Sequence, residues 1–157
     1  MDSGKVTHDR LGRKLVLIVD DEPDMLSMLR LVLGKKCGCH VLTASSGSHA
    51  ISLLDTSSPD VVVSDIKMPD LDGLQLLKKI REHDSTISVV IMTGYGTIDM
   101  AVQALKDGAY DFLEKPFDKD HIVRVVNHCI ERTSLLRANR QLKERISNLS
   151  PPKGFVG

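Results

Sequence analysis

The amino-acid sequence predicts an α/β fold, in which a doubly wound sheet of parallel strands is covered by helices on both faces. Two observations predict it. Five short apolar runs alternate along the chain with segments whose apolar residues recur at helical spacing. The first, third and fourth runs are almost unbroken, which is typical of strands buried on both faces. The predicted strands cover residues 15–19, 40–44, 61–64, 89–92 and 112–115.

Each predicted strand is followed by a helix that begins at a proline, a glycine or a polar capping residue. Asp21 is a candidate cap for the first helix, and Gly34 and Gly38 interrupt its apolar pattern. Thr97 is the candidate cap of the fourth helix. The five helices are expected to begin near Pro23, Ser46, Gly73, Thr97 and Asp118.

Length and charge exclude several classes of protein. A chain of 157 residues suits one domain with a short appendage. The 21 basic and 21 acidic residues cancel, so there is no overall attraction to nucleic acid or to a membrane. Residues 1–13 are polar and lack the apolar segment of a secretory signal, and we expect them to be flexible.

Cysteine usage indicates a reducing, cytoplasmic setting. Three cysteines are an odd number, which argues against a disulfide framework. Cys37 and Cys39, with His40 beside them, could suggest a metal site. No second cluster with ligand spacing accompanies them, so we interpret this segment as a turn and the start of a strand.

Polar residues stand at the carboxyl ends of four predicted strands. They are Asp20, Asp65, Thr93 and Lys115. In open parallel sheets, ligands bind beyond the carboxyl ends of the strands. We therefore expect these four side chains to converge at one edge of the sheet.

The convergence of carboxylates with a lysine favours phosphoryl transfer. Asp20, Asp21 and Asp65 would repel one another unless a hard cation such as Mg²⁺ bound between them. Lys115 could neutralise a phosphoryl oxygen, and Thr93 offers a hydroxyl. Asp65 stands alone at the end of its strand and is the candidate nucleophile, which would form an acyl phosphate. Each residue alone is ordinary, and the inference depends on the joint pattern.

The polar strand ends lie in four short segments, residues 18–22, 63–69, 92–96 and 114–117. These segments, in this order, resemble the motifs of the receiver domain of bacterial two-component response regulators, and the resemblance covers residues 14–130. The resemblance implies a flavodoxin-like fold with strand order 2-1-3-4-5, and phosphoryl transfer from a sensor histidine kinase to Asp65. A receiver catalyses only its own phosphorylation and dephosphorylation, so we do not expect an enzyme.

The resemblance also assigns roles to individual residues. The backbone carbonyl of Lys67 would complete the protein ligands of Mg²⁺. Thr93 would move to hydrogen-bond the new phosphoryl group, and Phe112 would turn inward behind it. The alternative for Phe112 is a plain core aromatic. The Lys115–Pro116 peptide bond is expected to be cis.

Residues 95–97 and 109–117 most resemble the receivers of nitrogen-regulation-type activators. Such activators place a receiver before an ATPase that works on sigma-54 polymerase, and then a DNA-binding domain. The chain shows neither a Walker phosphate loop nor a helix-turn-helix. We expect a piece of such a protein, with residues 150–157 as a flexible linker; the alternative is a receiver that stands alone.

The last helix is expected to continue to about residue 149, which is long for a closing helix. Its residues 131–149 carry an apolar seam with one asparagine, as in a two-stranded coiled coil. Dimerisation through this linker helix is the favoured interpretation, ahead of a basic nucleic-acid-binding arm or a helix folded back on its own domain. The seam consists of Leu135, Asn139, Leu142, Ile146 and Leu149.

Two rival functions remain open at this point. A metal-dependent phosphatase would use the same Asp65, Mg²⁺ and Lys115. Such an enzyme usually needs an acid two residues after the nucleophile, where this chain has Lys67. The other rival is a receiver-like module that no longer accepts a phosphoryl group.

Overall fold

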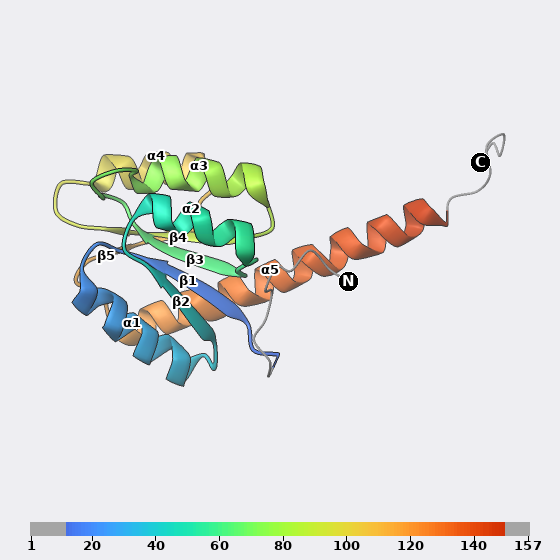
Figure 1. Cartoon of the computed structure of the whole chain (residues 1–157), viewed down its shortest axis with the longest axis horizontal. Coiled ribbons are helices and arrows are strands. Elements are labelled where there is room, and N and C mark those ends of the chain that lie inside the picture. Colours follow the sequence, from blue (N-terminus) through green and yellow to red (C-terminus); the bar gives the residue numbers. More distant parts are fainter. Residues whose placement is uncertain (1–11, 150–157) are drawn as a thin grey trace.

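The five strands form one parallel sheet in the order β2-β1-β3-β4-β5, as predicted (Figure 1). The structure is a computed structural model that describes residues 12–149. The segments 1–11 and 150–157, which include most of the two expected flexible ends, lie outside the described residues. The strands are β1 Leu15–Val19, β2 His40–Ala44, β3 Val61–Asp65, β4 Ser88–Thr93 and β5 Asp111–Glu114.

Helices cover both faces of the sheet, which gives the flavodoxin-like arrangement (Figure 1). Side chains on β1 alternate between the two faces: Leu17 packs beneath α2, α3 and α4, whereas Ile18 packs beneath α1 and α5. Both residues are fully buried, so the strand shows no polar alternation. The helices are α1 Pro23–Lys36, α2 Gly47–Thr56, α3 Gly73–His83, α4 Ile98–Lys106 and α5 Lys119–Asn148.

Two local predictions, the Asp21 cap and the break at Gly34, were wrong, and a third, the Thr97 cap, was right in position but not in its hydrogen bond. Glu22, not Asp21, is the N-cap residue of α1, and its side chain makes no capping hydrogen bond. Thr97 stands at the N-cap of α4, but its hydroxyl bonds to Gly94 instead of to the helix. Helix α1 continues through Gly34 to Lys36, because a single glycine costs a helix only about 1 kcal/mol and the packing of α1 outweighs it.

The predicted strand ends are correct to within one or two residues. Strand β3 includes Asp65, and Lys115 follows directly after β5. The Lys115–Pro116 peptide bond is cis, as expected. His40 begins β2, and Cys37 is the C-cap residue of α1, so that segment is the expected turn and strand start.

Helix α5 has 30 residues and extends well beyond the domain (Figure 1). Its first half buries an apolar stripe that includes Ile122, Val126 and Cys129 against the sheet. Its contacts with the domain continue past residue 130, as far as Arg140, which pairs with Asp84. No helix within residues 12–149 is long and apolar enough to cross a membrane.

Candidate functional site

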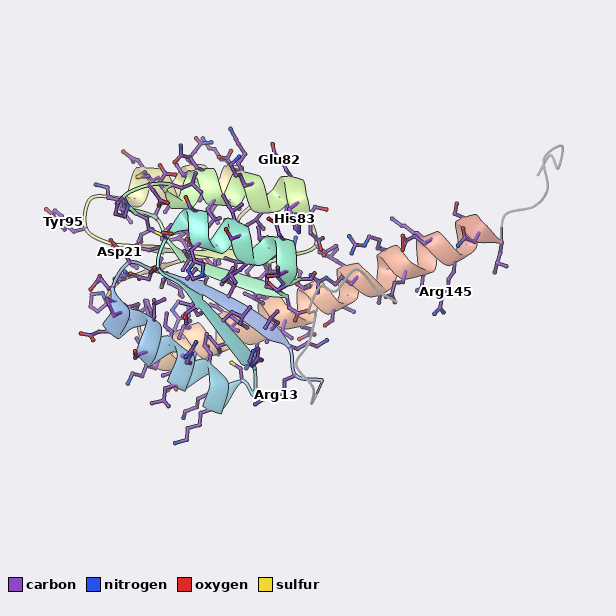
Figure 2. The ribbon with its side chains drawn as sticks, viewed as in Figure 1. Arg13, Asp21, Glu82, His83, Tyr95 and Arg145 are labelled. Carbon is purple, nitrogen blue, oxygen red and sulfur yellow. The ribbon has the colours of Figure 1, made fainter. Side chains whose placement is uncertain are left out.

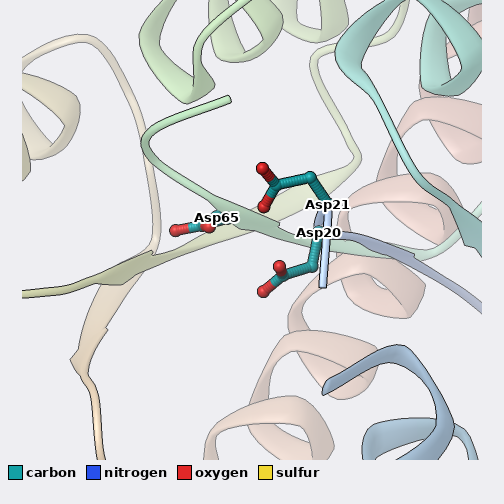
Figure 3. Close-up of side chains that lie close together, drawn as sticks. All are labelled: Asp20, Asp21 and Asp65. Carbon is teal, nitrogen blue, oxygen red and sulfur yellow. The ribbon is translucent and has the colours of Figure 1, made fainter. Parts of the chain in front are cut away.

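Three carboxylates meet at the carboxyl edge of the sheet (Figure 3). Asp20 follows β1 and is fully buried, Asp21 is exposed, and Asp65 ends β3 with 9% of its surface exposed. One oxygen from each lies within 4.8 Å of the others. Among residues 12–149, this is the one group of His, Cys, Asp and Glu side chains placed to hold a metal ion. The predicted convergence of the acids is confirmed.

Lys115 reaches the same three-residue group from the end of β5. Its Nζ donates a hydrogen bond of 2.9 Å to Asp20 Oδ2 and lies 3.4 Å from Asp65 Oδ2. With 17% of its side chain exposed, this ammonium is partly shielded from water, which strengthens both interactions. The lysine therefore lies between two of the acids.

Burial raises the pKa of Asp65; the charge of Lys115 opposes this effect, and the charge of Asp20 adds to it. For Lys115, burial acts to lower the pKa, but the hydrogen bond to Asp20 and the charges of Asp65 and Asp20 outweigh it. The net result is a raised pKa for Lys115. The site thus holds a fixed positive charge beside a carboxylate that is poorly solvated.

The backbone around Asp65 is held by close packing at the start of α3. A Cβ atom on Gly73 would lie 2.8 Å from the carbonyl oxygen of Asp65, so only glycine fits there without a shift. Gly73 N donates to Ile66 O over 2.8 Å, and Ile66 N donates to Met92 O over 3.0 Å. Asp72 and Gln75 form a capping box that fixes the first turn of α3. These contacts fix the end of β3, and with it Asp65.

Thr93 and Phe112 lie on neighbouring strands beside the acidic group. Thr93 ends β4 and is fully buried, and its hydroxyl donates to the carbonyl of Leu113 over 3.4 Å, a long and weak hydrogen bond. Phe112 pairs in register with Ile91 of β4 and packs, partly buried, against the core beneath α4. Thr93 is therefore at the expected edge of the sheet, whereas Phe112 is the second residue of β5 and lies two positions further from that edge.

Comparison with known proteins identifies the family to which a chain with this site belongs. Residues 16–127 match the response regulator receiver domain family. The chain belongs to this family. The matched range begins at the second residue of β1, covers the other four strands and ends within α5.

Curated relatives of this receiver are transcriptional regulators. It is 40% identical over 128 residues to the C4-dicarboxylate transport transcriptional regulatory protein DctD of Pseudomonas aeruginosa, covering 82% of this chain and 28% of that protein. It is 41% identical over 121 residues to the DNA-binding transcriptional regulator NtrC of Klebsiella pneumoniae, covering 76% and 25%. The chain thus spans little more than a quarter of these relatives. The expected likeness to receivers of nitrogen-regulation-type activators is confirmed.

A solved structure supports the same assignment. The receiver domain of NtrX from Brucella abortus superposes with a TM-score of 0.70 at 36% identity, covering 74% of this chain and 98% of that one.

The remaining predicted ligand of the receiver, Lys67, lies in the loop after Asp65. Lys67 and Asp21 line the same open groove of about 450 Å³, together with Met68, Pro69 and Met100. The loop therefore passes beside the acids. That the backbone carbonyl of Lys67 binds the metal ion stays a prediction.

Sequence reasoning missed one participant in the receiver's site. Glu22 Oε1 lies 3.8 Å from Lys115 Nζ, and the Glu22 backbone N–H donates to Asp20 Oδ1 over 2.9 Å. The third acid of the Asp20–Asp21–Glu22 run was a visible signal. Glu22 entered the sequence analysis only as part of the matching segment 18–22, with no role of its own.

Proposed function

We propose that this receiver accepts a phosphoryl group onto Asp65 from a phosphohistidine of a sensor histidine kinase, with Mg²⁺ bound, and then changes conformation. One observation carries the proposal. The Asp65 carboxylate stands beside Asp20 and Asp21, which suit a cation, and 3.4 Å from Lys115, which suits an anion.

In the proposed step, an Asp65 oxygen forms a bond to phosphorus as the histidine N–P bond breaks. The imidazole leaves with the electron pair and takes a proton from water, so that no further reactant is needed. Charge on the transferred oxygens is neutralised by Lys115, whose raised pKa keeps it protonated. Burial of Asp65 leaves its oxygens poorly hydrated and favours attack.

The donor set of the site fits Mg²⁺. Magnesium binds oxygen at 2.0–2.1 Å, so that oxygens on opposite sides of it are about 4 Å apart. The three carboxylate oxygens lie within 4.8 Å of one another and need only a small adjustment. Asp20, Asp21, Asp65 and the carbonyl of Lys67 would hold the ion. When bound, it neutralises the acids and orients the phosphoryl oxygens.

We propose Thr93 and Phe112 as the switch. The hydrogen bond of Thr93 to Leu113 is long at 3.4 Å, so that little free energy is lost when the hydroxyl moves to a phosphoryl oxygen. Phe112 is half-buried on the adjoining strand and would turn inward once Thr93 has moved. The phosphoryl group shifts this equilibrium because it contacts Thr93 in only one of the two states.

The proposed output is a change in pairing between two copies of α5. The apolar members of the seam are exposed, from 55% for Leu142 to 83% for Leu149. Leucines alternate there with Asn139 and Ile146, a pattern that favours two strands. The exposed seam opposes the interpretation of a helix folded back on its domain.

The wider setting is also a proposal. DctD and NtrC are named as transcriptional regulators, and this chain matches little more than a quarter of each. We propose that the receiver controls an ATPase that works on sigma-54 polymerase, with a DNA-binding domain beyond it. In this proposal the receiver itself touches neither nucleic acid nor membrane and works in the cytoplasm.

Chemical labelling tests the proposal. The chain is incubated with Mg²⁺ and a small acyl phosphate, and the labile phosphoryl group is located by mass spectrometry. We expect one group, on Asp65, which is lost in Asp65→Asn and on chelation of the metal. Asp24→Asn is a matched control, because Asp24 is an exposed acid in the first turn of α1 near the same edge.

The two rival functions predict other results. Sustained turnover of a phosphoester without a labelled Asp65 would indicate a phosphatase. Absence of any label with metal and donor in excess would indicate a module that does not accept phosphoryl groups. Either result contradicts the proposal.

A further inference from the structure

A second buried polar cluster lies at the opposite end of the sheet from the acidic site. Its centre is Asp60, which precedes β3 and is 2% exposed. Asp60 Oδ2 accepts a hydrogen bond of 2.8 Å from the backbone N–H of Leu15, at the start of β1. Asp60 Oδ1 is paired at 2.8 Å with Arg137 of α5. One carboxylate thus joins the first residue of β1 to α5.

Arg137 uses most of its guanidinium in this cluster. Its Nη1 binds Asp60, its Nε donates to Thr86 Oγ1 over 3.0 Å, and its Nη2 donates to the carbonyl of Pro59 over 2.9 Å. Its Nη2 also lies 3.6 Å from Asp84 Oδ2. A planar guanidinium bonded along several directions has little freedom to rotate. Arg137 therefore fixes this turn of α5 against the loops before β3 and β4.

Thr133, one turn earlier, adds a second attachment. Its hydroxyl donates to the carbonyl of Asp60 over 2.8 Å and shares a 2.8 Å hydrogen bond with Ser88. Both hydroxyl-bearing residues are buried. Arg132 donates to Ser88 Oγ over 2.9 Å from the partly exposed side. The helix is thus held at two successive turns.

The attached side of α5 and the apolar seam face opposite ways. At about 100° per residue, Leu142 lies half a revolution from Thr133, while Arg137 lies almost directly above Thr133. The seam from Leu135 to Leu149 is exposed, and beyond Arg140 the helix projects away from the domain, as the position of Arg145 shows (Figure 2). Contact with the domain therefore leaves the seam accessible.

We propose that the ion pair between Arg137 and Asp60 forms a joint, which sets the direction in which α5 leaves the domain. The hydrogen bonds of Thr133 attach the helix at a second point of this joint. The joint makes the domain and the first part of the helix extension one rigid body, with the seam directed away from the sheet. Asp60 lies within the family match, which ends at residue 127, and Thr133 and Arg137 lie beyond it. The joint goes beyond the proposed phosphoryl chemistry and does not depend on Asp65.

The direction of the helix is tested with two spin labels on one chain, one in the domain and one on the extension. Lys79→Cys and Gln141→Cys place the labels at exposed positions on α3 and α5. Cys37→Ser removes the native thiol that is partly exposed. The other two, Cys39 and Cys129, are buried, and burial raises the pKa of Cys129 to about 12, so both react slowly. Dilution with unlabelled chain keeps distances between two copies out of the measurement.

The decisive variant is Asp60→Asn with Arg137→Met, which removes both charges and leaves no buried ion unpaired. We expect a narrow distance distribution in the parent and about a doubling of its width in the double variant. Arg145→Met is the matched control, an exposed arginine on the same helix, and should leave the distribution narrow.

Three results would overturn the proposal. An unchanged width in the double variant would mean that apolar packing alone directs the helix. Broadening by Arg145→Met to the same extent would mean that any loss of charge loosens α5. Faster hydrogen exchange of the sheet amides together with those of α5 would mean that the pair stabilises the whole domain. Neither the distance distributions nor the hydrogen-exchange rates depend on whether Asp65 becomes phosphorylated.

Discussion

The ammonium of Lys115 lies 2.9 Å from a carboxylate of Asp20 that has no exposed surface, across 95 residues of sequence. A fully buried carboxylate is stable only with a charged partner or a metal ion. Asp20 therefore depends on Lys115 whenever Mg²⁺ is absent, and on both when it is bound.

Replacing Lys115 by Met should destabilise the domain more without metal than with it. Without Mg²⁺ the variant leaves Asp20 unpaired, which costs about 3–5 kcal/mol of unfolding free energy. Saturating Mg²⁺ should recover part of that loss. Urea denaturation with chelator and with Mg²⁺ measures both values. Lys119→Met, an exposed lysine at the start of α5, should change neither. Equal losses of unfolding free energy with and without Mg²⁺ would show that Asp20 does not interact with both the ion and Lys115.

Magnesium should stabilise the folded chain through the carboxylates of the site. An ion that binds only the folded state adds about 2.7 kcal/mol at a concentration one hundred times its Kd. We expect Asp21→Asn to remove most of this gain while leaving the metal-free stability almost unchanged, because Asp21 is exposed. The measurement is the shift of the urea midpoint on adding Mg²⁺. Asp24→Asn serves as the control. If Mg²⁺ shifts the urea midpoint of Asp21→Asn as far as that of the parent, Asp21 is not a ligand of the ion.

The parallel sheet and the convergence of the acids could be predicted from the residues because both follow from simple physics. The strand order, in contrast, was implied by the resemblance to receiver domains. Unbroken apolar runs require burial on both faces, and parallel strands bring their carboxyl ends to one edge. Asp20, Asp65 and Lys115 were therefore placed correctly without any tertiary information.

The hydrogen bonds and ion pairs within the acidic site, and those around Asp60 at the opposite end of the sheet, could not be predicted from the sequence. No role was assigned to Arg137 from the sequence, yet this residue binds Asp60, 77 residues away. Periodicity shows which face of a helix is apolar, but an arginine on the other face looks the same whether it meets water or a buried acid. Similarly, the cap at Asp21 was wrong because the side chain of Asp20 already bonds the N–H of Glu22.

Charge placed in the seam of α5 should abolish the proposed self-association. Leu142 is 55% exposed in the single chain and lies at the middle of the seam, so Leu142→Glu would bury a carboxylate between two helices. We expect a monomer by sedimentation at concentrations where the parent is dimeric. Gln141→Glu, which adds the same charge one residue earlier and off the seam, should leave the dimer intact. A parent that is monomeric at high concentration, with and without a phosphoryl mimic, would contradict the pairing itself.

Acid should weaken the attachment of α5 through Asp84. Burial raises the pKa of this carboxyl, but the hydrogen bonds from Thr86 and the charges of Arg137 and Arg140 outweigh it and lower the pKa below its ordinary value of 3.8. Because the folded pKa is the lower one, the stabilisation is complete above the ordinary pKa. It is lost as the pH falls through the folded value, below about pH 4.

The comparison of the parent with Asp84→Asn isolates this effect. Asp65 has a raised pKa and contributes with the opposite sign, but it is present in both proteins and cancels. At neutral pH the variant should lose about 1–2 kcal/mol, since two arginines lose a charged partner. As the pH falls below about 4, the difference in unfolding free energy should shrink toward zero. A difference that stays constant down to the acid limit would show that the charge of Asp84 does not hold the helix.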